Sequence, residues 1–153
     1  MGLFSKGVEL HKLHAEIDNL FNGNITFKVK EQTNDKVVIT ADIEAKQYFD
    51  DGIFVRIVAY KSGTCHVFMV FDQLDPTYEN LLMINEMNDN ISFLSAYISE
   101  KDSGKKYLEL HGSSIDAHDT KTLASNIQFF INQALADSVL KYLQPLTAHT
   151  YSN

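Results

Sequence analysis

The chain has 153 residues, of which 44% are hydrophobic and 22% are charged, and its formal net charge at pH 7 is −7. These totals predict one folded domain, residues 1–153, that needs neither a disulfide nor a metal for stability. Arg56 is the only arginine and Lys105–Lys106 the only adjacent basic pair, which argues against nucleic acid as a partner because phosphate binding needs clustered basic residues. The apolar runs are far too short to span a membrane, so we expect no membrane partner.

The single cysteine and the first ten residues also limit the possible functions. Cys65 lies in an apolar strand pattern, which favours a buried structural residue over a nucleophile. The opening run MGLFSKGVEL lacks the apolar core of a signal peptide. It also misses the myristoylation motif, because Lys6 stands where Ser or Thr is required. We therefore expect a cytoplasmic protein.

The first predicted helix covers residues 8–21. Its apolar residues recur at spacings of three and four, so they form one stripe along the helix. The stripe consists of Val8, Leu10, Leu13, Ile17, Leu20 and Phe21. Gly23 follows and suits the left-handed conformation at the end of a helix.

Four strands are predicted next. Residues 25–30 and 37–43 alternate between apolar and polar side chains, as in a hairpin with one side in water. The apolar positions are Ile25, Phe27, Val29, Val37, Ile39, Ala41 and Ile43. Residues 53–60 and 65–71 are apolar at nearly every position, which predicts two strands in the centre of the sheet.

A second helix is expected to open at the run DPTYENLLMINEMN, residues 75–88. Asp75 can cap it, and Pro76 suits the first helical position. A second hairpin, residues 91–99 and 105–112, follows around the turn EKDSGK. The apolar stripe of residues 119–144 then predicts one long closing helix that ends before Pro145.

The expected fold class is α+β, with a mostly antiparallel sheet packed with helices in the order α-ββββ-α-ββ-α. On a helical wheel started at Leu81, Asn85 and Asn88 fall on the same side as the core residues. Met83 and Met87 fall on the opposite side. We expect both amides to be buried structural groups that bond to backbone at the corner between helix and strand.

These residues carry a resemblance. The helix that ends in INEMN (84–88), the following strand FLSAYI (93–98), and the spacing of the last helix resemble the YbjN-type bacterial family, which shares the fold of type III secretion chaperones. The likeness runs from about residue 75 to 143 and rests on Asn85, Asn88, Phe93, Ala96 and Tyr97. It implies a small acidic α+β domain, often dimeric, that binds protein segments and performs no chemistry. Secretion chaperones usually have three strands between their first two helices, whereas four are expected here.

Several residue groups could carry chemistry. His11 and His14 can share a helix face, but a zinc site needs further ligands, and His14 also fits a packing role in the apolar stripe. The acid pairs Asp50–Asp51 and Asp72 with Asp75 fit turn and capping roles better than acid–base catalysis. The serines of HGSSID, residues 111–116, lack a nucleophile elbow. We expect no catalytic residue, no metal and no cofactor.

Surfaces remain as the candidate functional features. Met83 and Met87 can form an adaptable partner surface, or a neighbouring element can cover them. Phe93, Tyr97 and Tyr107 are expected to gather on the sheet face away from Leu108, as a dimer or peptide surface unless a helix covers them. The favoured function is a non-catalytic, chaperone-like domain that binds a protein partner and forms a homodimer. The alternative is an effector-binding regulator with a pocket between the sheet and the long closing helix.

Overall fold

The computed structural model describes residues 7–45, 48–50, 52–113 and 115–148. Its helices are α1 (Leu10–Phe21), α2 (Tyr78–Asn90), α3 (Thr120–Ala134) and α4 (Asp137–Ala148). Its strands are β1 (Phe27–Gln32), β2 (Lys36–Ile43), β3 (Ile53–Tyr60), β4 (Cys65–Gln73), β5 (Ser95–Glu100) and β6 (Lys106–Gly112). The predicted α+β class and the order of elements as far as β6 are confirmed.

The strands form one antiparallel sheet in the order β1-β2-β3-β4-β6-β5. The two strands with the most continuous apolar sequence, β3 and β4, lie at its centre, as predicted. Strands β1 and β5 form the two edges. Between Val29 and Glu31 a bulge shifts the register of β1, and Val29, expected in the core, is 40% exposed.

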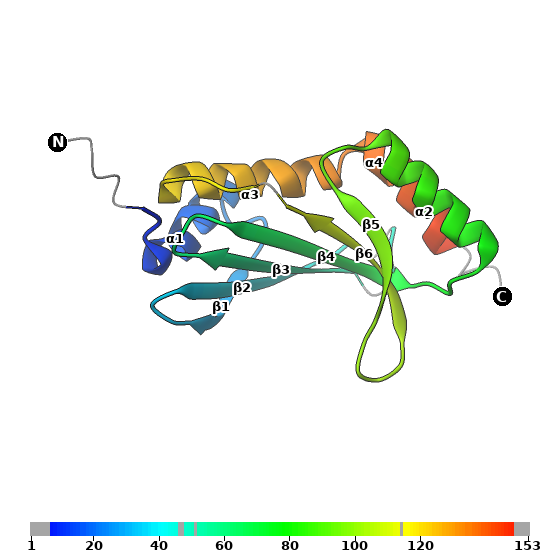
Figure 1. The fold of residues 1–153 in the computed structure, drawn as a ribbon, viewed down its shortest axis with the longest axis horizontal. Helices are drawn as coiled ribbons and strands as arrows, with labels where there is room; N and C mark the ends of the chain where they lie inside the picture. The colour runs from blue at the N-terminus through cyan, green and yellow to red at the C-terminus, as the bar shows by residue number, and fades with distance from the viewer. Residues whose placement is uncertain (1–6, 46–47, 51, 114, 149–153) are drawn as a thin grey trace.

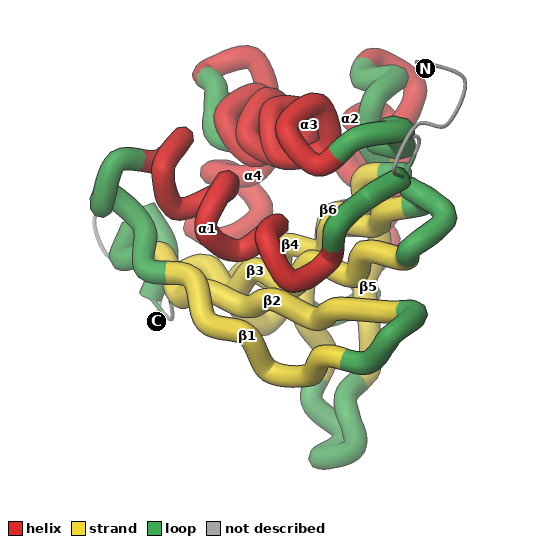
Figure 2. The backbone as a smooth tube through the Cα atoms, turned by 90° about the vertical axis from the view of Figure 1, so that its left-hand side faces the viewer, coloured by secondary structure: helices red, strands yellow, loops and turns green. Residues whose placement is uncertain are grey.

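The helices lie over one face of this sheet (Figures 1 and 2). Helix α1 packs on α3 and on the first strands, whereas α2 and α4 pack together beside β5. A hydrogen bond joins α1 to the sheet, with His14 Nε2 2.7 Å from the Phe27 carbonyl oxygen. Within the helical layer, the Glu9 amide at the start of α1 donates to Thr120 Oγ1 at the start of α3, at 2.8 Å. The core between the layers is built from the inward residues of alternate strand positions and the apolar helix stripes.

Gly112 shows how closely the layers approach. A Cβ atom at this position of β6 would lie 2.5 Å from the ring of Phe130 on α3. Real Cβ atoms do not come so close to a ring, so the helix packs here on a strand with no side chain.

The prediction of a single long closing helix was wrong. The chain instead forms α3 and α4, with a break at Leu135 and Ala136 where the Ala136 amide bonds back to the Gln133 carbonyl. The break contains neither glycine nor proline, and the apolar stripe continues through it. The sequence pattern therefore did not indicate the break. Pro145 does not end the helix either. It lies within the last turn of α4, where the loss of one hydrogen bond is tolerated.

The start of the second helix also differs from the prediction. Thr77, not Asp75, is the N-cap, and its side chain accepts a hydrogen bond from the Asn80 amide at 3.2 Å. The Asp75 carbonyl oxygen instead accepts from the Asn80 side chain at 2.9 Å.

Candidate functional site

The sheet face opposite the helices is uncovered in the part of the chain that the structure describes (Figure 2). We call the outward side chains of its central strands the open face. They include Phe54, Arg56, Val58, His66, Phe68, Val70, Tyr107, Glu109 and His111, together with Tyr97 of the edge strand β5 on the same side. A soluble sheet face that no helix covers usually carries polar residues. The aromatic and apolar members of this face therefore call for an explanation.

The strand register brings three aromatic and cationic groups into one row. Arg56 of β3 is paired with Phe68 of β4, and Phe68 is paired with His111 of β6. The Arg56 guanidinium carbon lies 4.8 Å from the centre of the Phe68 ring. On the other side, the rings of Phe68 and His111 stack with centroids 4.6 Å apart and planes 9° apart. Cation–π and stacking contacts fix the orientation of this row.

A second histidine extends the row. His66 Nδ1 and His111 Nε2 are 2.9 Å apart, and the ring centroids are 5.1 Å apart. The two nitrogens therefore face each other and share one proton, rather than pointing at a common third atom as metal ligands do. Burial lowers the pKa of His111, the neighbouring His66 lowers it further, and Glu109 opposes both effects. A fully protonated pair would bring two positive charges into contact.

A buried carboxylate lies next to this row. Glu109 is 7% exposed, and its Oε2 lies 3.6 Å from Lys101 Nζ on the hairpin turn. Tyr97 is paired with Glu109 across β5 and β6. Burial raises the pKa of Tyr97 to about 12, and the charge and hydrogen bond of Glu109 contribute. The Tyr97 hydroxyl therefore stays protonated as a donor to Glu109.

These groups border a shallow depression of about 390 Å³. Its lining consists of Phe54, Arg56, Phe68, Val70, Lys101, Tyr107 and Glu109. An apolar floor with one arginine and a paired carboxylate has the composition of a protein interface centre.

Two of the three residues of the predicted aromatic surface lie on the open face. Tyr97 and Tyr107 lie on the same side of the sheet as Glu109. Phe93 does not. It precedes β5 and meets Phe130 of α3 edge to face, with ring centroids 6.1 Å apart, so it belongs to the helical side. The alternation that assigned Phe93 to the open face begins only at Ser95.

The predicted methionine surface was wrong. Met87 is completely buried in the core, and Met83 is partly buried against it. The buried residues of α2 are Asn80, Ile84 and Met87, followed by Ile91 just beyond the helix, whereas Leu81 and Leu82 are exposed. The buried face of α2 is thus rotated away from the face that the helical wheel centred on Leu81 predicted.

The two amides have different roles. Asn85 is exposed, so its predicted burial was wrong. Asn88 makes the predicted backbone bonds: its Nδ2 donates to the Ala96 carbonyl at 2.9 Å, and its Oδ1 accepts from the Ala96 amide at 2.7 Å. Asn88 thereby fastens the end of α2 to β5, although the side chain is not buried.

The other residues considered for chemistry lie apart from one another. His14 is partly buried and also lies 3.1 Å from Asp18, whereas His11 is exposed. Asp72 is buried and accepts a hydrogen bond from the Asp50 amide at 3.0 Å. Asp51 and Ser114 lie outside the described residues. Within residues 7–45, 48–50, 52–113 and 115–148, no group of three or more His, Cys, Asp or Glu side chains is placed to hold a metal ion.

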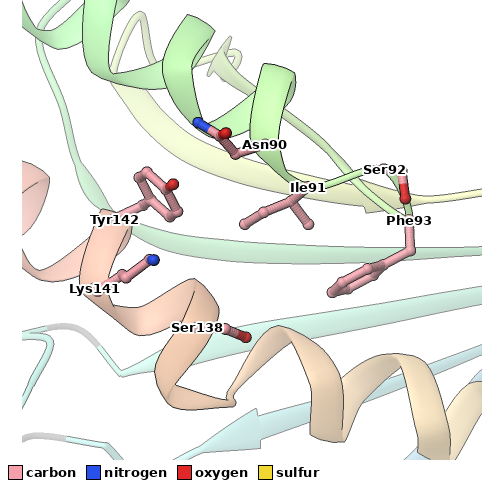
Figure 3. Close-up of a pocket in the computed structure, with 7 residues that line it drawn as sticks. All are labelled: Asn90, Ile91, Ser92, Phe93, Ser138, Lys141 and Tyr142. Atoms are coloured by element: carbon pink, nitrogen blue, oxygen red, sulfur yellow. The ribbon is translucent and has the colours of Figure 1, made fainter.

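A second hollow lies on the helical side (Figure 3). It has a volume of about 450 Å³ and lies between the end of α2, the link to β5 and α4. Its lining residues are Asn90, Ile91, Ser92, Phe93, Ser138, Lys141 and Tyr142. Lys141 Nζ lies 5.1 Å from the centre of the Tyr142 ring. This hollow is polar at its rim and is not the expected pocket between the sheet and a long helix.

The fold and the open face together define an antiparallel α+β domain whose described helices lie on one side of the sheet. Comparison of the chain with protein-family models, with curated proteins and with solved structures gives no significant match. Among the described residues, no helix is long and apolar enough to cross a membrane.

Proposed function

We propose that this chain is a non-catalytic, chaperone-like protein-binding domain of the bacterial cytoplasm, related to the YbjN-type family, and that it forms a homodimer through the open face. The observation that carries this proposal is the row Arg56–Phe68–His111 on an uncovered sheet. Aromatic residues and arginine are enriched in protein interfaces, and such residues gain most from desolvation at the centre of a contact.

Charge favours a second copy as the occupant of this face. The chain as a whole carries −7, so two copies repel each other across most surfaces. The open face is close to neutral in comparison. Arg56 lies at its centre and balances the charge of Asp42, the register partner of Phe54, whereas the acids Glu31 and Glu109 are paired with Lys36 and Lys101 at 3.5 and 3.6 Å. Two copies can therefore approach at this face with the least repulsion.

The test is the mass of the protein in solution as a function of concentration. Sedimentation velocity should give twice the chain mass at high concentration and dissociation on dilution. Phe54→Glu, at a 39% exposed position of the open face, should shift the protein to monomer by adding an unpaired charge to the interface. Phe129→Glu is the matched control, because Phe129 is 66% exposed on α3 and lies on the helical side.

Both variants must first retain the wild-type melting temperature, so that a change in mass reports association. A wild-type protein that stays monomeric into the hundreds of micromolar would contradict the proposal. Equal masses for the Phe54 variant and the wild type would place the interface elsewhere.

A second candidate function is the binding of a small carboxylate in the hollow of Figure 3. Lys141, Ser138 and Asn90 bring an ammonium group, a hydroxyl and an amide to its rim. This combination suits a small anion with hydrogen-bond acceptors. Succinate and inorganic phosphate should then raise the melting temperature of the wild type but not of Lys141→Gln. Equal shifts for both proteins would argue against this candidate.

A further inference from the structure

Strand β5 is an edge of the sheet, and its outer edge has an alternating set of backbone groups. At the turn of the hairpin the Lys101 amide donates to the Lys105 carbonyl at 2.9 Å, which fixes the odd-numbered residues of β5 as the ones that bond to β6. The amides and carbonyls of Ala96, Ile98 and Glu100 consequently point outward, away from the sheet.

At Ala96 the outward groups are already satisfied. The Asn88 carboxamide donates to the Ala96 carbonyl and accepts from its amide, as the peptide group of a neighbouring strand would. This contact ends the free part of the edge. Beyond it, Ile98 and Glu100 offer two amides and two carbonyls to which no strand of the sheet is paired.

These free groups lie along a groove of about 470 Å³ between α2 and β5. One wall is formed by Leu81, Ile84 and Asn85 of α2, and the other by Ile98 and Glu100, with Lys106 beside them. Leu81 is 43% exposed, so an apolar side chain of α2 is presented to whatever lies in the groove. A helix beside a free strand edge is an arrangement in which proteins bind a peptide as an added strand.

We propose that this groove binds an extended segment of a partner polypeptide, which adds to β5 as a short strand at Ile98 and Glu100 and packs apolar side chains on Leu81. The chemistry of the site selects this occupant. Alternating amide and carbonyl groups at strand spacing are complementary to an extended backbone and to few other ligands. The groove goes beyond the proposed homodimer and lies at the β5 edge of the sheet, away from Phe54 and Arg56.

A second copy of the chain fits the groove poorly. The β5 edge of each copy lies in the groove beside its own α2. If two such edges faced each other, neither copy would place a strand in the groove of the other. The free edge also comprises only two outward residues, Ile98 and Glu100. Such a contact is far below the roughly 1,200 Å² of a stable interface between folded proteins. A flexible segment can enter the groove and use both walls.

The experiment uses a random dodecapeptide library displayed on phage and selected on the immobilised full chain. Enriched sequences are synthesised, and their affinity is measured by fluorescence anisotropy. Glu100→Pro removes an outward amide without touching the bonds to β6, and it should weaken binding at least tenfold. Glu100→Gln keeps the amide and should bind within about twofold of the wild type, which separates the backbone bond from the side-chain charge. Leu81→Asp, on the opposite wall, should also weaken binding at least tenfold.

Amide spectra identify the site independently of the variants. Addition of a selected peptide to ¹⁵N-labelled chain should shift the Ile98 and Glu100 amides and slow their hydrogen exchange. The proposal is overturned if no peptide is enriched above the blank surface. It is also overturned if enriched peptides bind Glu100→Pro and Leu81→Asp as tightly as the wild type, or leave both amides unshifted. Phe54→Glu should retain peptide binding, so failure of the groove and failure of the homodimer are distinguishable.

Discussion

Replacement of Asn88 by Ala should destabilise the domain because it removes the two bonds that join α2 to β5. The bonds measure 2.9 and 2.7 Å and satisfy both backbone groups of Ala96. A net hydrogen bond contributes about 0.5–1.5 kcal/mol, so the pair contributes about 1–3 kcal/mol. Asn88 is exposed, and water can replace part of each bond, so we expect a loss of about 1–2 kcal/mol.

The matched control is Asn85→Ala on the same helix. Both changes replace an exposed asparagine by alanine, so both gain the same few tenths of a kcal/mol of helix propensity. Only the Asn88 change removes the bonds to Ala96. The difference between the two variants therefore isolates the corner that Asn88 fastens.

Urea unfolding followed by circular dichroism measures this difference. Asn88→Ala should lower the unfolding midpoint at an unchanged slope and reduce the melting temperature by about 3–6 °C. Asn85→Ala should stay within about 0.5 kcal/mol of the wild type. Equal stability of the two variants would refute the assignment of the corner to Asn88.

Three further outcomes are expected. Gly112→Ala should lower the free energy of unfolding in urea by about 1–3 kcal/mol, because the new methyl group meets the Phe130 ring, and adding Phe130→Leu should recover part of the loss. A Gly112→Ala protein more stable than the wild type would contradict the close approach. Burial lowers the pKa of His111 in the folded protein below its ordinary 6.5, so the unfolded chain binds more protons and the free energy of unfolding should fall as the pH drops below 6.5. His111→Phe should flatten this pH dependence, and an unchanged slope would exclude His111 as its source. Burial raises the pKa of Cys65 to about 12, so a thiol reagent at pH 8 should label Cys65 only after denaturation. Rapid labelling of the native protein would be inconsistent with the burial of Cys65.

The order of elements could be predicted because strong local patterns determine it. Alternation in residues 37–43 and continuous apolar runs in residues 53–60 and 65–71 assigned β2, β3 and β4 to their places. These patterns depend only on which side chains can be buried. The break between α3 and α4 could not be predicted, because Ala134, Leu135 and Ala136 are all good helix formers. Helix α4 packs on α2, a contact that no local pattern encodes.

The open face was only partly predictable. Tyr97 and Tyr107 were assigned to it by alternation, but Phe54 and Phe68 were not recognised, because an apolar residue at every position of a strand indicates burial on both faces. The arrangement of the helices on one face is a tertiary property. The available signal was the single arginine within an otherwise apolar strand, since Arg56 marks the face that is not buried.

The predicted orientation of α2 was wrong for a different reason. Its apolar residues lie on all sides, so a wheel has no unique apolar stripe. The choice of Leu81 as the centre turned Asn85 inward and Met87 outward, whereas the core is contacted by Ile84, Met87 and Ile91. A helix whose two faces are both apolar is oriented by its neighbours and not by its own sequence.

Site-specific photo-crosslinking tests the central claim, self-association through the open face, most directly. With benzoylphenylalanine in place of Phe54, irradiation should give a covalent dimer whose crosslinks map to β3, β4 or β6 of the second copy. The same probe in place of Phe129 should give only monomer. A dimer that forms from position 129 and not from position 54, or no dimer from either, would contradict the role assigned to the open face.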